Sequence, residues 1–406
     1  MEMWRDGGMS SIARPETESH HLYVHVPFCR LVCAYCDFVT VGGRTDAIPQ
    51  YVAALHAELA LRPAPGELAT IYFGGGTPSL LPVEAVAGLV KAAIDRWGHT
   101  PDEITLEANP SAREAPVWAG LRSAGMNRIS LGAQSLRDAD LRALARGHSA
   151  REVREAIHAA RAAGFDNVSL DLIYGIPGQT LGSWRTVLRN AIALEPAHLS
   201  LYALQLALAP DEWSAPPRPG ALRWRRRVAA RQDDGLAAAQ YGLAGEMLDA
   251  AGYRHYELSS WAAPGRESRH NGAYWDRRPY TGIGAGAHSF DGAARSWNVR
   301  DLDRYLAMAG AGQRPLAGGE SLDEPTRAFE AVALGLRRVE GMSRRAFERE
   351  FGVDPLASYG PALHQSAADG LLAIDTDRLH LTPRGRLLAS EVLIGLLPGA
   401  ADAASA

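Results

Sequence analysis

Short apolar runs alternate along the first half of the chain with longer segments in which apolar residues recur every three or four positions. The short runs predict buried strands and the longer segments predict amphipathic helices. The six predicted strands are Leu22–Val26, Thr70–Phe73, Ile104–Glu107, Arg128–Leu131, Asn167–Leu172 and Leu199–Leu204. The predicted helices between them are Ile48–Leu61, Pro82–Trp97, Ala112–Ala124, Ala150–Ala163 and Leu181–Leu194. Repeated βα units predict an α/β fold with a parallel sheet and right-handed crossovers. Six units are too few for a closed eight-stranded barrel and favour a curved, open (βα)6 sheet.

The pattern divides the chain into four parts. Residues 1–20 show no periodicity and predict a disordered leader, before a (βα)6 core over 21–206. Residues 207–322 begin with a proline- and tryptophan-rich stretch that predicts an irregular loop. The five arginines between positions 223 and 231 predict a solvated helix face, with a patch for an anionic partner as the alternative. Residues 323–406 predict helices, a short hairpin and a last helix to about Leu397, which together indicate a winged-helix-like α+β module.

Composition narrows the class of protein. Hydrophobic residues make up 47% of the chain and charged residues 22%, as in a globular protein with a large core. The net charge of −4 gives no basic footprint for nucleic acid. Residues 1–20 lack the apolar segment of a signal peptide, and the apolar run Val392–Leu397 is too short to span a bilayer. Because three cysteines do not form a disulfide framework, we expect a reducing, cytoplasmic location.

All three cysteines lie in one short stretch directly after the first predicted strand. Cys29, Cys33 and Cys36 have the spacing C-x3-C-x2-C. Three thiolates can hold three irons of a [4Fe–4S] cube, which leaves the fourth iron open to a substrate or cofactor. The alternatives are three unrelated cysteines or a zinc site completed by His25, although zinc sites favour C-x2-C pairs and four closed ligands.

Polar residues at the ends of the other predicted strands indicate where the chemistry collects. In βα barrels the loops at the carboxyl ends of the strands form a common mouth. The side chains that would face it are Glu107, Gln134, Asp171 and Tyr202 with Ala203. The glycine run Gly74–Gly76, followed by Thr77, allows close approach of the backbone to a ligand. His148 after the fourth strand is either part of this site or a solvated helix end.

The segment 253–298 is dense in His, Tyr, Trp and Gly. It contains a strand-like run, Tyr253–Trp261, and then His270, Asn271, Tyr274 and Trp275 in the order His-Asn-x-x-Tyr-Trp. A histidine beside aromatic rings suits a flat, conjugated ligand such as haem, with the imidazole on the iron. The alternative is that His270 only makes hydrogen bonds within a loop.

Taken together, these motifs resemble the HemN/HemW family of radical S-adenosylmethionine (SAM) proteins. The resemblance runs from about residue 21 to 397 and includes Tyr23-x-His-x-Pro-Phe-Cys, the cysteine spacing, Phe73-Gly-Gly-Gly-Thr-Pro-Ser79, Leu106-Glu-Ala-Asn-Pro110, Gly132-Ala-Gln-Ser135 and Asp171-Leu-Ile-Tyr-Gly-Ile-Pro177. It implies that the cysteines hold a [4Fe–4S] cluster and that SAM chelates its open iron. The implied SAM contacts are Tyr23, Tyr35, Gly75, Gly76, Thr77, Glu107, Gln134, Arg146 and Asp171, with Ala203 and the loop 286–288 on the far side.

Two details favour the HemW branch of that family. The coproporphyrinogen III dehydrogenase branch carries a further cysteine two residues after the third, whereas this chain has Phe38 there. The His-Asn-x-x-Tyr-Trp motif is similar to the haem-binding motif of HemW. The resemblance therefore implies a haem chaperone that passes haem to apo-haemoproteins, notably membrane respiratory subunits. It also admits a homodimer and peripheral contact with the membrane.

Two other functions stay open at this point. The same cluster could serve a radical SAM enzyme that acts on a porphyrinogen or methylates a related macrocycle. The C-terminal module could instead bind DNA or a partner protein, although it lacks a basic recognition helix.

Overall fold

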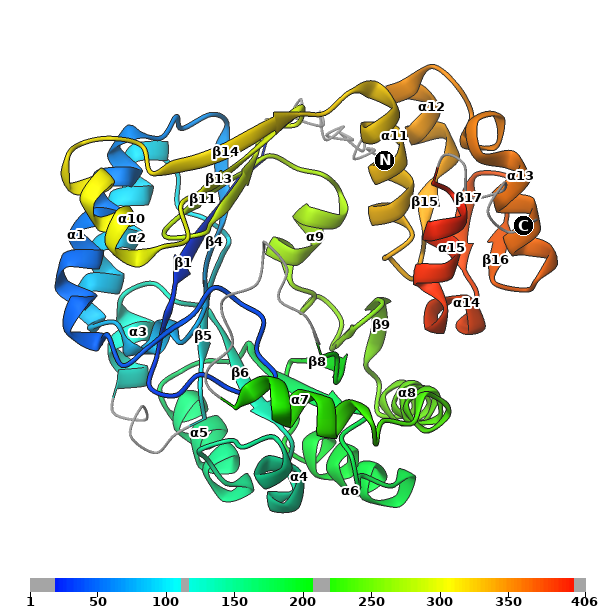
Figure 1. Cartoon of the computed structure of the whole chain (residues 1–406), viewed down its shortest axis with the longest axis horizontal. Helices are drawn as coiled ribbons and strands as arrows, with labels where there is room; N and C mark the ends of the chain where they lie inside the picture. Colours follow the sequence, from blue (N-terminus) through cyan, green and yellow to red (C-terminus); the bar gives the residue numbers. More distant parts are fainter. Residues whose placement is uncertain (1–18, 111–116, 207–219, 398–406) are drawn as a thin grey trace, which may run out of the picture.

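The computed structural model describes residues 19–110, 117–206 and 220–397. Its centre is a curved sheet of six parallel strands, each predicted by the sequence, and a crossover joins each of the first five to the next. In spatial order they are β1 (Ser19–Val26), β4 (Glu67–Gly75), β5 (Glu103–Ala108), β6 (Arg128–Gln134), β7 (Val168–Tyr174) and β8 (His198–Ala203). The α/β fold with a partial, open (βα)6 barrel is therefore confirmed (Figure 1).

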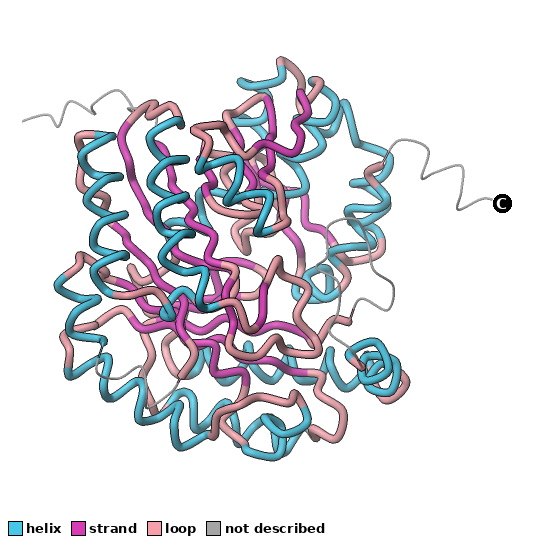
Figure 2. Tube along the Cα trace, turned by 60° about the vertical axis from the view of Figure 1, so that its left-hand side comes forward, coloured by secondary structure: helices cyan, strands magenta, loops and turns pink. Residues whose placement is uncertain are grey.

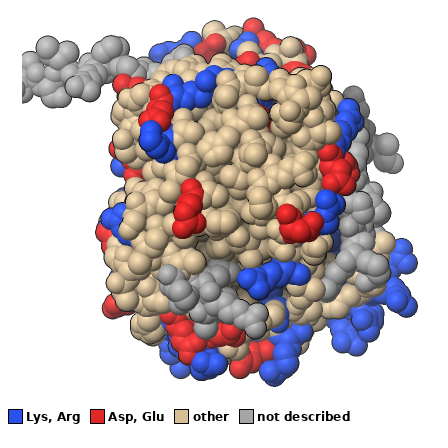
Figure 3. All heavy atoms as spheres, turned by 90° about the vertical axis from the view of Figure 1, so that its left-hand side faces the viewer, with Lys and Arg blue, Asp and Glu red and all other residues tan. Residues whose placement is uncertain are grey.

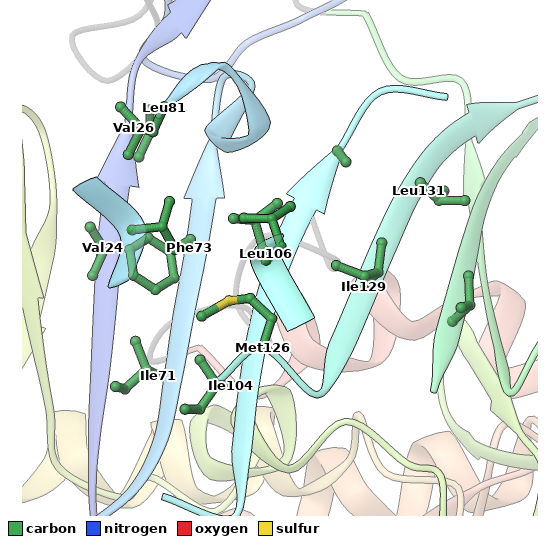
Figure 4. Close-up of a cluster of buried hydrophobic side chains, with 14 of the residues drawn as sticks. Val24, Val26, Ile71, Phe73, Leu81, Ile104, Leu106, Met126, Ile129 and Leu131 are labelled. Carbon is green, nitrogen blue, oxygen red and sulfur yellow. The ribbon is translucent and has the colours of Figure 1, made fainter. Parts of the chain in front are cut away.

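Helices cover the convex side of this sheet (Figure 2). They are α1 (Ile48–Leu61), α2 (Val83–Trp97), α3 (Trp118–Ser123), α4 (Asp138–Ala143), α5 (Ala150–Ala162) and α6 (Leu181–Ile192). The prediction missed α4, and part of the predicted helix Ala112–Ala124 lies outside the described residues. Alternate side chains of the strands, such as Val24, Phe73 and Leu106, form the apolar layer beneath the helices (Figure 4). The other side chains of each strand face the barrel interior.

The segment after β8 extends the sheet at both edges. On one edge β11 (Tyr280–Ile283) adds parallel to β1, followed by β12 (His288–Phe290), β13 (Ala294–Asn298) and β14 (Leu316–Ser321). On the other edge the predicted strand-like run 253–261 forms a hairpin of two strands, β9 (Arg254–Glu257) and β10 (Ser260–Ala262), antiparallel to β8. The helices of this segment are α7 (Ala221–Ala229), α8 (Asp234–Ala250), α9 (Arg269–Trp275) and α10 (Leu302–Gly310).

The C-terminal module has a hydrophobic core of its own and a small antiparallel sheet. Its helices are α11 (Glu324–Gly335), α12 (Arg344–Phe351), α13 (Pro355–Ala368), α14 (Pro383–Leu387) and α15 (Ala389–Gly395). Its sheet combines the predicted hairpin, β16 (Leu372–Ile374) and β17 (Arg378–Leu381), with a short third strand, β15 (Met342–Ser343). This arrangement agrees with the predicted winged-helix-like α+β module.

The surface shows no single dominant charge on the side that carries α1 and α10. Charged residues of both signs are scattered there around a broad neutral centre (Figure 3). No helix within the described ranges is both long enough and apolar enough to cross a membrane.

A buried ion pair ties α1 to the extension of the sheet. Glu58 in α1 accepts from Arg62 Nε at 3.0 Å, from Tyr305 Oη of α10 at 2.7 Å and from the Gly284 amide at 2.9 Å. The Glu58 and Arg62 side chains are 0% and 3% exposed. Because a buried carboxylate is stable only when its oxygens are paired, this cluster fixes where α10 and the β11 edge dock.

We predict that Glu58→Ala lowers the free energy of unfolding by about 3–5 kcal/mol, because Arg62 would remain buried without its counter-charge. The matched control is Asp95→Ala, which breaks an exposed i,i+4 pair with Lys91 and should change stability by less than about 0.5 kcal/mol. Denaturant unfolding followed by circular dichroism measures both variants. Equal effects of the two substitutions would contradict the assignment.

Candidate functional site

The three cysteines lie together at the carboxyl end of the barrel. The loop that carries them starts in β2 (Phe28–Cys29) and returns in β3 (Val41–Gly42), which pairs parallel to β2. All three cysteines border one cavity of about 390 Å³. The structure therefore brings the cysteine loop and the predicted strand-end residues to one mouth.

The cysteine sulfurs face donors that suit thiolate ligands. Thr77 Oγ1 lies 3.6 Å from Cys29 Sγ, and Arg146 Nη1 donates to Cys33 Sγ at 3.1 Å. Arg146 also donates to Asn109 Oδ1 at 2.7 Å and to the Gly132 carbonyl at 3.0 Å, so it ties the loop to β5 and β6. Three sulfurs on one cavity wall, beside a half-buried cation, fit the three protein ligands of a [4Fe–4S] cluster.

The zinc alternative finds no support in the position of His25. Its Nε2 bonds to the Val39 carbonyl at 2.8 Å, and its Nδ1 bonds to Tyr23 Oη at 3.0 Å. Within the described part of the chain, no group of three or more His, Cys, Asp or Glu side chains is arranged to hold a single metal ion. His25 therefore supports the loop from below and does not complete a metal site with the cysteines.

Arg225 of α7 holds the cysteine loop from the other side. Its Nε donates to the Ala34 carbonyl at 2.8 Å. Its Nη2 donates to the Cys36 carbonyl at 2.9 Å and forms an ion pair with Asp37 at 2.7 Å. The predicted solvated arginine face is wrong for this residue, whose side chain is 4% exposed. The helical spacing of Ala221, Arg225 and Val228 could have indicated it, since these positions share one face of α7.

The glycine run is required by packing against β1 as well as by the cavity. Gly75 has φ +113°, and a Cβ there would lie 2.5 Å from the His25 ring. A Cβ on Gly76 would lie 2.7 Å from the carbonyl oxygens of Pro27 and Phe28. Both glycines and Thr77 border the cavity that the three cysteines line, which we call the upper cavity. Only glycine lets the backbone run between β1 and this cavity.

Two half-buried carboxylates line the same cavity. Glu107 accepts from Tyr72 Oη at 2.7 Å and from the Gly75 amide at 3.1 Å, and burial raises its pKa to about 7. Asp171 accepts from Ser130 Oγ at 3.1 Å, and burial raises its pKa to about 6. Each carboxylate would be stabilised by a bound cationic group.

Most of the remaining predicted SAM contacts line the cavity too. Tyr35, Ala203 and Gln134 do so, and Gln134 has the strained value φ +63° at a bulge where β6 ends. Tyr23 does not line the cavity, because its hydroxyl bonds to His25 and its ring stacks on Tyr72 inside the barrel. The loop 286–288 also lies away from the lining residues, and a Cβ on Gly286 would contact Val39.

The predicted haem motif lies at the opposite end of the barrel, on the short helix α9. His270 is 1% exposed, and both of its ring nitrogens are paired. Nδ1 bonds to Thr70 Oγ1 near the start of β4 at 2.6 Å, and Nε2 bonds to Tyr274 Oη at 2.9 Å. The His270 ring stacks on Tyr72 with centroids 5.0 Å apart. His270 lies in a helix and not in a loop, but both ring nitrogens make hydrogen bonds, as the alternative expected, so haem ligation by His270 stays a prediction.

Trp275 is the motif residue that contacts the C-terminal module. The Arg337 guanidinium lies 4.3 Å from the centroid of the Trp275 ring, and the next residues on α9 continue the contact through an Arg277–Glu350 ion pair at 2.8 Å. Tyr274 packs edge-on against Tyr280 of β11. The backbone N–H of Asn271 donates to Ser268 Oγ at 3.3 Å, and this hydrogen bond caps the start of α9.

His148 takes neither of the two predicted roles in full. Its Nε2 bonds to the Ala133 carbonyl at 3.0 Å, and burial lowers its pKa to about 4. It borders an adjoining hollow of about 310 Å³, which shares Cys33 and Arg146 with the cysteine cavity. It is therefore a half-buried neighbour of the cysteine loop.

The comparisons with known proteins agree with this fold. The model of the radical SAM superfamily matches residues 23–191, and the model of the HemN C-terminal domain matches residues 322–388. The structure of coproporphyrinogen III oxidase (HemN) from Escherichia coli, a radical SAM enzyme, covers 95% of this chain and 91% of its own, with a TM-score of 0.79 at 24% identity. Fold and site thus define a radical SAM protein with a HemN-type C-terminal domain, and this class implies a [4Fe–4S] cluster and SAM as cofactors.

Curated relatives identify the family within that class. The heme chaperone HemW of Mycobacterium tuberculosis is 39% identical over 93% of this chain and 94% of its own length. HemW of Bacillus subtilis is 31% identical over 91% and 97%. The mitochondrial radical S-adenosyl methionine domain-containing protein 1 of Bos taurus is 32% identical over 96% and 90%. The chain therefore belongs to the HemW family of haem chaperones.

We predict that Arg225→Ala makes the cluster labile, because the Ala34 and Cys36 carbonyls and Asp37 would lose their common donor. After anaerobic reconstitution, loss of cluster absorbance in the presence of an iron chelator should be about 10- to 100-fold faster than in the wild type, as for loss of an outer-shell partner.

Arg226→Ala is the matched control, since the neighbouring arginine on α7 is exposed. It should retain the cluster as the wild type does. If Arg225→Ala shows the same iron content and bleaching rate as that control, the assigned role of Arg225 is wrong.

Proposed function

We propose that this chain is a haem chaperone that carries a [4Fe–4S] cluster and SAM at the upper end of the barrel and takes up haem at α9. It would then pass the haem to apo-haemoproteins, among them membrane respiratory subunits. The observation that carries this proposal is the complete His-Asn-x-x-Tyr-Trp motif on α9, at the opposite barrel end from the cysteine loop, in a chain of the HemW family.

The proposed SAM site is the cavity beside the cysteines. Cys29, Cys33 and Cys36 would hold the cluster, and a [4Fe–4S] cluster with an open iron supplies one electron to bound SAM in this superfamily. Gly75, Gly76 and Thr77 would receive the amino acid part of SAM, while Glu107 offers a carboxylate to its amino group. Tyr35, Gln134, Arg146, Asp171 and Ala203 complete the walls.

The proposed haem element is α9 with His270, Asn271, Tyr274 and Trp275. In the ligand-free chain the His270 imidazole is neutral, because burial lowers its pKa well below the ordinary range. A neutral imidazole is the form that ligates iron. Its two hydrogen bonds would have to open for iron to reach it, which suits a cargo that must also be released.

A porphyrinogen-converting enzyme is the competing function, since the upper cavity keeps every carboxylate that SAM would need. The residue two positions after the third cysteine argues against an enzyme. Phe38 is 68% exposed at the rim of the cavity, where the enzyme branch carries a further cysteine. A large apolar side chain in water at this rim suits contact with a partner protein better than chemistry on a small substrate.

We predict that SAM binds more weakly as the pH falls from 8 to 6. The pKa of Glu107, raised to about 7, means that its carboxylate is largely charged at pH 8 and largely protonated at pH 6. Its attraction for the SAM amino group is lost with that charge, so affinity should fall by roughly tenfold. Anaerobic calorimetry on cluster-loaded protein measures it.

Glu107→Gln is the variant that isolates this effect. Its affinity at pH 8 should resemble that of the wild type at pH 6, and its pH dependence should be much flatter. A wild-type affinity that does not change between pH 6 and 8 would exclude Glu107 as the cationic contact.

The proposed function is tested by haem titration followed by transfer. Cluster-loaded wild type should bind haem near stoichiometrically and deliver it to an apo-haemoprotein such as apomyoglobin, with SAM left intact. His270→Ala should bind more weakly, whereas His158→Ala on the exposed face of α5 should behave as the wild type. Absence of haem binding, or conversion of coproporphyrinogen III with turnover of SAM, would overturn the proposal.

A further inference from the structure

Helix α9, which carries the proposed haem motif, is held at its two ends by different parts of the molecule. At its start, the Glu103 carboxylate of β5 accepts from the backbone N–H groups of Arg269 at 3.1 Å and His270 at 3.0 Å. At its end, the three consecutive residues 275–277 all contact the C-terminal module. The barrel therefore fixes one end of the helix and the module fixes the other.

The contacts at the end of α9 are polar. They consist of a guanidinium 4.3 Å from the centroid of an indole ring and of two ion pairs at 3.3 and 2.8 Å. The pairs are Trp275 with Arg337, Asp276 with Arg338, and Arg277 with Glu350. We call these three pairs the α9 clamp. Because water solvates charged groups well, such contacts separate at a much lower cost than an apolar core does.

The clamp is narrow, because a hollow lies on either side of it. Asp276 and Arg338 border a hollow of about 680 Å³, and Trp275 and Arg277 border another of about 280 Å³. Within the described ranges, Leu258 is the only barrel side chain that packs against the hydrophobic core of the module. A module joined to its neighbour by a small, polar contact can move without unfolding.

Arg277 has a backbone conformation that arginine disfavours. Its φ is +54°, at the left-handed position of a turn in which the Arg278 N–H donates to the Ala273 carbonyl at 2.9 Å. Glycine is the usual residue at this position of a helix end, because a Cβ is strained in the left-handed region. What arginine adds there is the ion pair with Glu350. The strain therefore points to a role for this contact beyond ending the helix.

His270 is closed off while the clamp is in place. Its side chain is buried, both ring nitrogens are paired, and its ring stacks on Tyr72 inside the barrel. Haem can reach the imidazole only if α9 turns away from the end of the barrel. The start of α9 is bound to the buried Glu103, so the clamped end is the one that can open.

We propose that the C-terminal module is an autoinhibitory restraint, which holds α9 closed through the α9 clamp and thereby limits how fast haem reaches His270. This inference rests on the proposed haem chaperone function and adds its regulation. Haem would leave through the same opening, so one contact would govern both uptake and release.

The test measures the rate of haem association by stopped-flow absorbance in the full-length, cluster-loaded protein. Arg277→Gly removes the ion pair and relieves the left-handed strain, so its unfolding midpoint in denaturant should stay close to that of the wild type. Arg277→Glu replaces the ion pair by repulsion from Glu350. The double variant Arg277→Glu/Glu350→Arg restores opposite charges in reversed order.

We expect Arg277→Gly to bind haem about threefold to fivefold faster than the wild type, which corresponds to the loss of one partly exposed ion pair. Arg277→Glu should be faster still, and the double variant should return close to the wild-type rate. This return separates the clamp from a general loss of folding.

Arg266→Glu is the matched control. It reverses a charge shortly before the start of α9, in an exposed ion pair with Asp166 of the barrel. Because this pair does not involve the module, the variant should bind haem at the wild-type rate.

Three results would overturn the inference. If the wild type binds haem and the Arg277 variants bind it no faster, the module does not restrain α9, and the chaperone function still stands. If the double variant stays as fast as Arg277→Glu, the pair with Glu350 is not the restraint. If the wild type itself binds no haem, the proposed function fails first and the inference fails with it.

Discussion

A hydrogen-bonded column through the barrel interior is the constraint on which both ends of the molecule depend. Thr70, Tyr72 and Gly74 alternate along β4 and occupy the positions that face the interior. Tyr72 stacks on His270 with its ring and donates to Glu107 with its hydroxyl, and Glu107 reaches the Gly75 amide. Since polar groups buried in such a place must remain paired, the glycine turn above and helix α9 below are positioned by one set of contacts.

That column separates the molecule into two chemically different sites. The upper site offers sulfur, carboxylate and backbone groups beside the cysteine loop, which suits a cluster and a small cationic cofactor. The lower region offers histidines, aromatic rings and arginines, which suits a large planar acid with a metal centre.

The fold was largely predictable because buried strands and helices leave a clear repeat of apolar residues in the sequence. The six strands and helix α1 fall where the apolar pattern placed them, whereas α4 has only six residues, too few for periodicity to detect. The residues at the mouth were predictable because strand ends in βα units meet at one edge. Tyr23 stays a predicted SAM contact, although its ring stacks on Tyr72 inside the barrel, because its position within β1 is not fixed by the rule for strand ends. Arg225 was missed since a run of arginines resembles a solvated surface, although one of the five turns inward to the cysteine loop.

The positions of iron in crystals of the cluster- and haem-loaded protein would test the account most directly. Anomalous scattering at the iron edge should give two separate sites at opposite ends of the barrel. One should lie beside Cys29, Cys33 and Cys36, and the other beside His270 of α9. A haem iron found at the upper mouth, next to the cluster, would contradict the account and would instead place the porphyrin as a substrate for SAM chemistry.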